Sequence, residues 1–108
     1  MANTFKLKTK ANVGVTTSNV YVVPSATTTV VIGVTLSNTS GSSINVGVGV
    51  TRPSADDVSL MKNVPIPQGS SFEFMGGNKV VLETTDTLTA ESDVNNSLDV
   101  ALTIMEIT

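Results

Sequence analysis

The chain of 108 residues contains no cysteine, no histidine and no tryptophan, and aromatic residues make up only 4% of it. Without cysteine, these residues offer neither a disulfide nor a thiolate metal ligand. Without histidine, they lack the usual general base and the commonest metal ligand. Charged residues are also scarce at 14%, whereas valine and threonine, which suit a half-buried pleated strand, are abundant. The composition therefore predicts a β protein whose core is filled by branched aliphatic side chains.

The formal net charge of −3 is unevenly spread along the chain. Residues 1–55 hold four basic residues and no acidic residue, and residues 56–108 hold two basic residues and all nine acidic ones. Such asymmetry can steer head-to-tail contacts between like subunits; alternatively, the two halves meet in one sheet and their charges cancel locally. Three nearby lysines in an acidic chain do not form a nucleic-acid patch. We expect no nucleic acid and no membrane as partner, because no apolar run approaches the roughly 20 residues of a membrane span. The first ten residues lack the apolar stretch of a secretory signal, which predicts synthesis in a cytoplasm.

Residues 27–51 form the central pattern of the sequence. Two rows of alternating apolar residues flank a polar turn at Ser40–Ser43. The rows are Val30, Ile32, Val34 and Leu36, then Ile44, Val46, Val48 and Val50. A period of two places each row on one face of a strand, so this stretch predicts a β-hairpin.

Shorter alternating runs on both sides of the hairpin predict the other strands. They lie within residues 4–10, 12–23, 58–64, 71–74, 79–84, 87–91 and 98–107. The glycine turn Met75–Asn78 predicts a second hairpin. Strands at spacings of roughly 8–12 residues predict a single domain, residues 1–108, folded as an antiparallel β-sandwich of about eight strands. Its topology is either immunoglobulin-like or jelly-roll-like, with almost no helix beyond one turn around Asp56.

The last strand has apolar residues on both of its faces. Its main row is Leu98, Val100, Leu102 and Ile104, but Met105 and Ile107 fall on the opposite face. Either a bulge reverses the register near the end, or both faces of the sheet are covered there.

Two groups of residues are candidates for a protein interface. Gly33, Gly47 and Gly49 occupy outward positions of the predicted hairpin and would leave a shallow, uncharged platform for the backbone of another subunit. The alternative is that they mark bulges or the approach of a neighbouring loop. Lys6, Lys8 and Lys10 alternate with Phe5 and Leu7 on the first strand. These lysines either protect a sheet edge or dock an acidic partner.

Catalytic and cofactor sites are not predicted. Serine and threonine are plentiful, but a nucleophile would lack a histidine base. Asp56 and Asp57 lack the ligand spacing of a calcium loop, and Asn78-Lys79 leads into a strand instead of the helix of a phosphate-binding loop. We therefore expect no enzyme, no cofactor and no metal site.

The second half of the chain resembles small virion structural proteins of tailed bacteriophages, in particular those of marine bacteria and cyanobacteria. The matching segments are LMKNVPIPQGSS (residues 60–71), GNKVVLE (77–83), DTL (86–88) and the ends of the last strand, with VVIGVTLSNTSG (30–41) in the same style. Thr85 departs from the glycine that often precedes the aspartate in that family, which leaves the local turn type open.

This resemblance implies a non-enzymatic virion protein that decorates or cements the phage capsid. Its expected partners are the major capsid protein or other virion proteins and further copies of itself, in the virion. The alternatives are a neck, tail or fibre component, or a carbohydrate-binding adhesion module. A module of the last kind normally stacks sugars on exposed aromatic residues, and Tyr21 and Phe74 are the available candidates.

Overall fold

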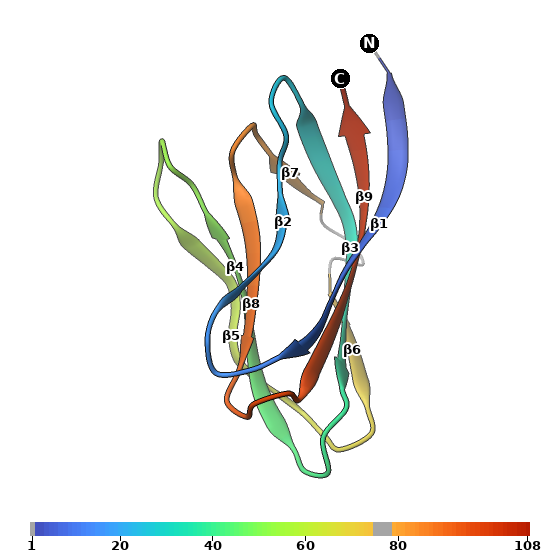
Figure 1. The fold of residues 1–108 in the computed structure, drawn as a ribbon, viewed down its shortest axis with the longest axis vertical. Coiled ribbons are helices and arrows are strands. Elements are labelled where there is room, and N and C mark those ends of the chain that lie inside the picture. Colours follow the sequence, from blue (N-terminus) through green and yellow to red (C-terminus); the bar gives the residue numbers. More distant parts are fainter. Residues whose placement is uncertain (1, 75–78) are drawn as a thin grey trace.

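The computed structural model describes residues 2–74 and 79–108, and they form two antiparallel sheets packed face to face (Figure 1). Sheet A has the order β1-β9-β3-β6, with β7 also paired to β3, and sheet B has the order β2-β8-β4-β5. The strands of sheet A are β1 (Asn3–Val13), β3 (Thr28–Asn38), β6 (Ser71–Phe74), β7 (Val80–Leu82) and β9 (Leu98–Ile107). Those of sheet B are β2 (Ser18–Val22), β4 (Ile44–Thr51), β5 (Val58–Ile66) and β8 (Thr87–Ser92). The predicted all-β sandwich is confirmed, and the described residues contain no helix, including around Asp56.

The strand pairing is that of a jelly roll, one of the two predicted topologies. The first strand pairs with the last, β2 with β8, β3 with β6 and β7, and β4 with β5. This pattern arises when one long antiparallel hairpin rolls up into two sheets. Both ends of the chain lie at the same end of the sandwich (Figure 1). Ala2 and Thr108 exchange two backbone hydrogen bonds of 3.0 and 2.9 Å there.

The central hairpin prediction is wrong, because β3 and β4 lie in different sheets. The loop between them crosses from sheet A to sheet B and is held by the buried side chain of Asn38. Its Nδ2 donates to the carbonyl oxygens of Ser42 and Ile66, at 2.8 and 2.9 Å. Alternation identifies the apolar face of each strand, but two such faces can meet by packing across the core as readily as by pairing.

The second predicted hairpin is also wrong. Its turn, Met75–Asn78, lies outside the described residues, but the flanking strands do not pair with each other. Phe72 pairs with Leu36 and Val81 with Val30, so β6 and β7 lie one after the other along the same edge of β3. Within β7, Val80 is half-buried and Leu82 is fully buried.

A bulge in β3 changes which residues face the core. The register with β9 shifts between Val31 and Gly33. Thr29 and Val31 therefore face inward before the bulge, in place of the predicted Val30 and Ile32. Val34 and Leu36 are buried as expected, and the predicted rows of β4 and β9 are confirmed throughout. The core is completed by residues from the other strands and connections, including Val13, Val23, Ile66, Leu82 and Leu88.

Candidate functional site

The lysine-bearing strand β1 lies at the edge of sheet A, as expected of an edge guarded by charge. Lys6, Lys8 and Lys10 pair with Ile104, Leu102 and Val100 of β9. Their side chains therefore point to the side of the sheet on which the core lies, where Lys6 and Lys10 are exposed and Lys8 is half-buried. Phe5 and Leu7 point to the outside and are 70% and 65% exposed.

Lys6 belongs to a polar cluster between the two sheets. Its Nζ lies 2.7 Å from Oε1 of Glu106, a buried carboxylate of β9. The hydroxyl of Tyr21, from β2, donates to Oε2 of Glu106 at 2.6 Å and lies 2.8 Å from Oγ1 of Thr29. The cluster thus connects sheet B to three strands of sheet A through one tyrosine.

Each polar side chain of this cluster has a hydrogen-bond partner within the fold, which is typical of a structural contact. Hydrogen bonds from Lys6 and Tyr21 hold the pKa of Glu106 below its usual value in spite of burial. Burial, followed by the hydrogen bond to Glu106, raises the pKa of Tyr21 to about 12. Glu106 therefore stays ionised and Tyr21 stays neutral over the ordinary pH range. Tyr21 is buried in the core and is not an exposed aromatic residue.

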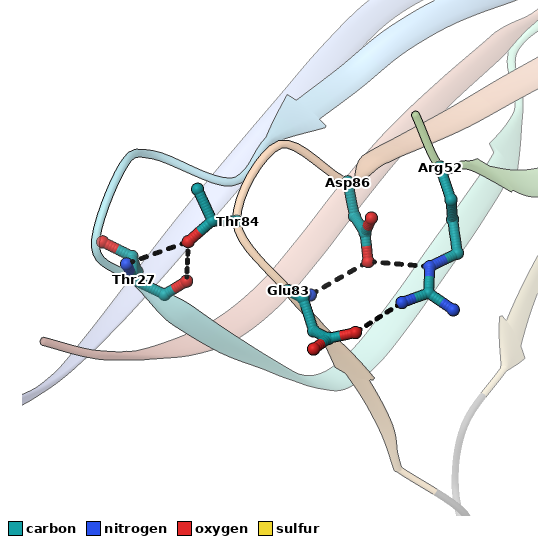
Figure 2. A network of polar contacts seen from close by, with 5 residues as sticks. All are labelled: Thr27, Arg52, Glu83, Thr84 and Asp86. Atoms are coloured by element: carbon teal, nitrogen blue, oxygen red, sulfur yellow. Dashed lines mark hydrogen bonds and ion pairs between the residues drawn. The ribbon is translucent and has the colours of Figure 1, made fainter. Parts of the chain in front are cut away.

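A second polar network surrounds the turn between β7 and β8 (Figure 2). Arg52, at the end of β4, donates to Asp86 Oδ2 at 3.1 Å and to Glu83 Oε1 at 2.6 Å. Asp86 Oδ2 also accepts the backbone N–H of Glu83 at 2.9 Å. Thr84 Oγ1 accepts the N–H of Thr27 at 3.3 Å and donates to its carbonyl at 2.9 Å. The turn therefore ties β4 of sheet B to the start of β3 in sheet A.

An open depression of about 460 Å³ lies beside this turn, lined by Arg52, Glu83, Asp86 and small neighbours. Its charged groups are already paired with one another: Arg52 forms ion pairs with Glu83 and with Asp86, and both pairs hold the turn in place. In residues 2–74 and 79–108, no three histidine, cysteine, aspartate or glutamate side chains converge as metal ligands. The same residues include no helix long and apolar enough to cross a bilayer. The depression thus offers a polar surface without an evident reactive group.

The three candidate glycines do not lie on one surface. Gly33 lies on the outside of sheet A, at the bulge of β3, and a Cβ there would meet no atom within 4 Å. Gly47 and Gly49 lie on the outside of sheet B, where a Cβ would come within 3.4 Å of the Met61 carbonyl oxygen and 3.0 Å of the Val58 carbonyl oxygen, respectively. Irregular pairing of β4 with β5 brings these carbonyls close. At Gly47 and Gly49 the absence of a side chain therefore makes room for β5, whereas Gly33 is open; an interface role for these glycines stays a prediction.

The outside of sheet A carries an apolar surface that the sequence reasoning missed. Phe5 pairs with Met105, Met105 with Val30, and Val30 with Val81, so these four side chains form one row across β1, β9, β3 and β7. Together with Leu7 and Ile107 on the same face, we call them the outer patch. The sequence signal for this surface was the pair Met105 and Ile107. Because β9 pairs with β1 without a bulge up to this end, these two residues lie on the outer face, and both faces of β9 are apolar there.

Comparisons with known proteins identify the fold without identifying a family. No protein-family model matches the chain, and no curated protein matches it in sequence. The fold is that of a solved pilus protein. The solved protein comes from Bacillus endospore appendages, which are described as a novel family of disulfide-linked pili. The two structures match with a TM-score of 0.59 and a sequence identity of 11%, and the match covers 99% of the present chain and 87% of the pilus protein. At this identity the likeness shows the fold alone. The 108 residues here contain no cysteine, so they cannot form the disulfide links of that appendage.

Proposed function

We propose that this chain is a non-enzymatic structural subunit of a multi-copy assembly. The observation that carries the proposal is the combination of a jelly-roll sandwich, an apolar outer face that the described residues leave exposed, and charged groups that pair within the fold. Jelly rolls occur in viral capsid proteins as well as in lectins and cupins. The pilus protein with the same fold supports a role of this general kind, although a fold by itself hosts many functions.

The specific assembly that we propose is a bacteriophage virion, in which the chain decorates or cements the capsid. The sequence resemblance to small virion proteins supports this choice. The partners would be the major capsid protein and further copies of the chain, held by complementary faces and by pairing at sheet edges. In the same setting, a neck, tail or fibre component is the nearest alternative. A carbohydrate-binding module receives less support, because Tyr21, one of its two candidate aromatics, is only 5% exposed.

A surface appendage is the second candidate, and the likeness to the pilus protein favours it. If this is the assembly, its subunits are linked without disulfides between these residues, because cysteine is absent.

The location and stoichiometry of the chain in purified particles test these proposals. Antibodies against the recombinant chain would be used to label phage particles and appendages by electron microscopy, and quantitative mass spectrometry would count copies. On the order of hundreds of copies on the head supports capsid decoration, whereas about six or twelve indicates a neck or tail ring. Labelling along filaments supports the appendage. Absence of the chain from every particle and filament would contradict a structural role.

A further inference from the structure

The outer patch has the features of a surface that another protein covers. Its row of Phe5, Met105, Val30 and Val81 is contiguous across four strands. Phe5 and Val81, at the two ends of the row, are 70% and 58% exposed. Single exposed apolar side chains are ordinary on protein surfaces, but a contiguous group of large ones is characteristic of an interface.

The strand positions next to the row on its own face are uncharged. Within the described strands, the neighbouring outward positions next to the row are Asn3, Thr28, Thr103 and Gly33. Of the charged residues near this face, Glu73 and Asp99 lie toward the opposite end of the strands. Lys79 and Glu83 flank β7 at the edge of the patch, where Glu83 is paired with Arg52. A partner that covers the patch must therefore bring an apolar, uncharged face, because a charge buried without a counter-charge is costly.

The outside of sheet B does not meet this requirement. It presents Glu91 and Thr89 beside Gly47 and Gly49, and Asn19 beside Thr89. Docking the outer patch on this side of another copy would bury the Glu91 carboxylate against apolar side chains. Of the two sheet faces that a second copy offers, its own outer patch is the complementary one.

The size of the patch sets the strength of the contact. Four strands about 4.8 Å apart and three rows on the same face about 6.6 Å apart give a footprint of roughly 400 Å² per copy. The total of roughly 800 Å² lies below the ~1,200 Å² of a standard stable interface. A single contact of this kind is weak and becomes effective when it is repeated or reinforced by other contacts, as in a lattice.

We propose that a second copy of this chain covers the outer patch, with the two patches packed face to face about a two-fold axis. Two sheets packed in this way keep their strands nearly aligned, and an isologous contact uses the same residues twice. This inference rests on the multi-copy assembly proposed above and names the surface that two copies share.

Sedimentation velocity of the purified chain over a wide concentration range tests the proposal. We expect the wild type to show monomers in equilibrium with dimers, and Phe5→Lys and Val81→Lys each to shift the midpoint of association to at least tenfold higher concentration. Val22→Lys is the matched control, because Val22 is 51% exposed and lies on the outside of sheet B. Circular dichroism verifies that each variant is folded. Association of Phe5→Lys and Val81→Lys at the wild-type midpoint would overturn the patch as the interface, while self-assembly itself would survive.

A wild type that remains monomeric at about 1 mM has an association free energy weaker than about 4 kcal/mol, and this result would also overturn the proposal. The structural role would then be judged separately, by the location of the chain in particles.

Cysteine trapping gives a second, independent test because the chain has no cysteine of its own. Met105→Cys and Val30→Cys place one thiol at the centre of the row, where a two-fold axis brings the two copies together. Under mild oxidation we expect a covalent dimer from at least one of them, and none from Val22→Cys. A disulfide requires Cβ atoms about 3.5–4.5 Å apart. Equal trapping from Val22→Cys, or none from either central position, would overturn the two-fold arrangement.

Discussion

Replacing Glu106 with glutamine removes one buried negative charge and preserves the shape of the side chain. In the native protein, Glu106 accepts hydrogen bonds from Lys6 Nζ at 2.7 Å and from Tyr21 Oη at 2.6 Å. A hydrogen bond to a charged group contributes about 1.5–3 kcal/mol. The contribution of Lys6 is at the lower end, because its side chain is 42% exposed and solvent screens it. We expect Glu106→Gln to lower the free energy of unfolding by about 2 kcal/mol at pH 7.

The dependence of this loss on pH distinguishes the charge from the shape of the side chain. Because the pKa of Glu106 in the folded protein lies below its ordinary value of 4.5, the folded state favours the ionised form. Its stabilising contribution is complete above the unfolded pKa and disappears as the pH falls through the folded pKa. The difference between Glu106→Gln and wild type should therefore shrink toward zero at strongly acidic pH.

Urea denaturation followed by far-ultraviolet circular dichroism measures both effects. Glu73→Gln serves as control, because Glu73 is an exposed carboxylate of β6, and its effect should be within about 0.5 kcal/mol at every pH. A deficit for Glu106→Gln that is equal at neutral and acidic pH would refute the electrostatic explanation. So would a deficit at neutral pH no larger than that of the control.

Three further predictions concern other described residues. Tyr21 is the sole tyrosine, so the phenolate absorbance of the folded protein should titrate near pH 12 instead of 10, and stability should fall as pH rises through this interval. In thermal melts, Gly49→Ala should cost about 1 kcal/mol or more, since its Cβ would lie 3.0 Å from a backbone carbonyl; Gly33→Ala should cost less than about 0.5 kcal/mol, and an equal effect would contradict the assignment of close approach. Asp86→Ala should cost about 2 kcal/mol in urea titrations, because Asp86 is buried with two donors. Glu83→Ala, with a side chain 72% exposed, should cost under about 0.5 kcal/mol.

Alternation in the sequence predicted the inward face of most long strands. Leu98, Val100, Leu102 and Ile104 are all buried, because a strand that packs one face on a core has to place apolar residues at every second position. The same reasoning gave the correct fold class. It failed within β3, where one extra residue between Val31 and Gly33 reverses the alternation, and where the adjacent residues Val30, Val31 and Ile32 are all apolar.

The partners of the strands were less predictable than their faces. Alternation with a period of two does not determine whether β3 and β4 pair side by side or face each other across the core. The turn residues between them suit either connection. Asn38 was the informative residue: a polar side chain continuing the inward row after Leu36 is buried only if it bonds to backbone, as it does to Ser42 and Ile66.

The candidate site was predicted least well, because its residues were grouped by the wrong pairing. Gly33 belonged with Gly47 only if β3 and β4 formed a hairpin, and the two glycines now lie on opposite outer faces. The lysines were correctly read as residues of an edge strand, but the partner of Lys6 is Glu106, exactly one hundred residues further along the sequence and adjacent only after the roll closes. Long-range pairs of this kind cannot be inferred from local pattern.

The apolar residues that the core does not use are the part of the sequence that the fold leaves unexplained. The inward row of β9 fills the sandwich, yet Met105 and Ile107 continue apolar character on the outside, next to Phe5 of β1. A solvent-facing strand has no need of them, and exposed apolar surface on an edge region favours aggregation. Covering this surface removes apolar side chains from water, but much of the gain from one contact is offset by the cost of association, which is about 4–15 kcal/mol or more. In a chain without cysteine, this burial is a non-covalent means by which repeated copies can hold together, and weak single contacts become strong when each subunit makes several.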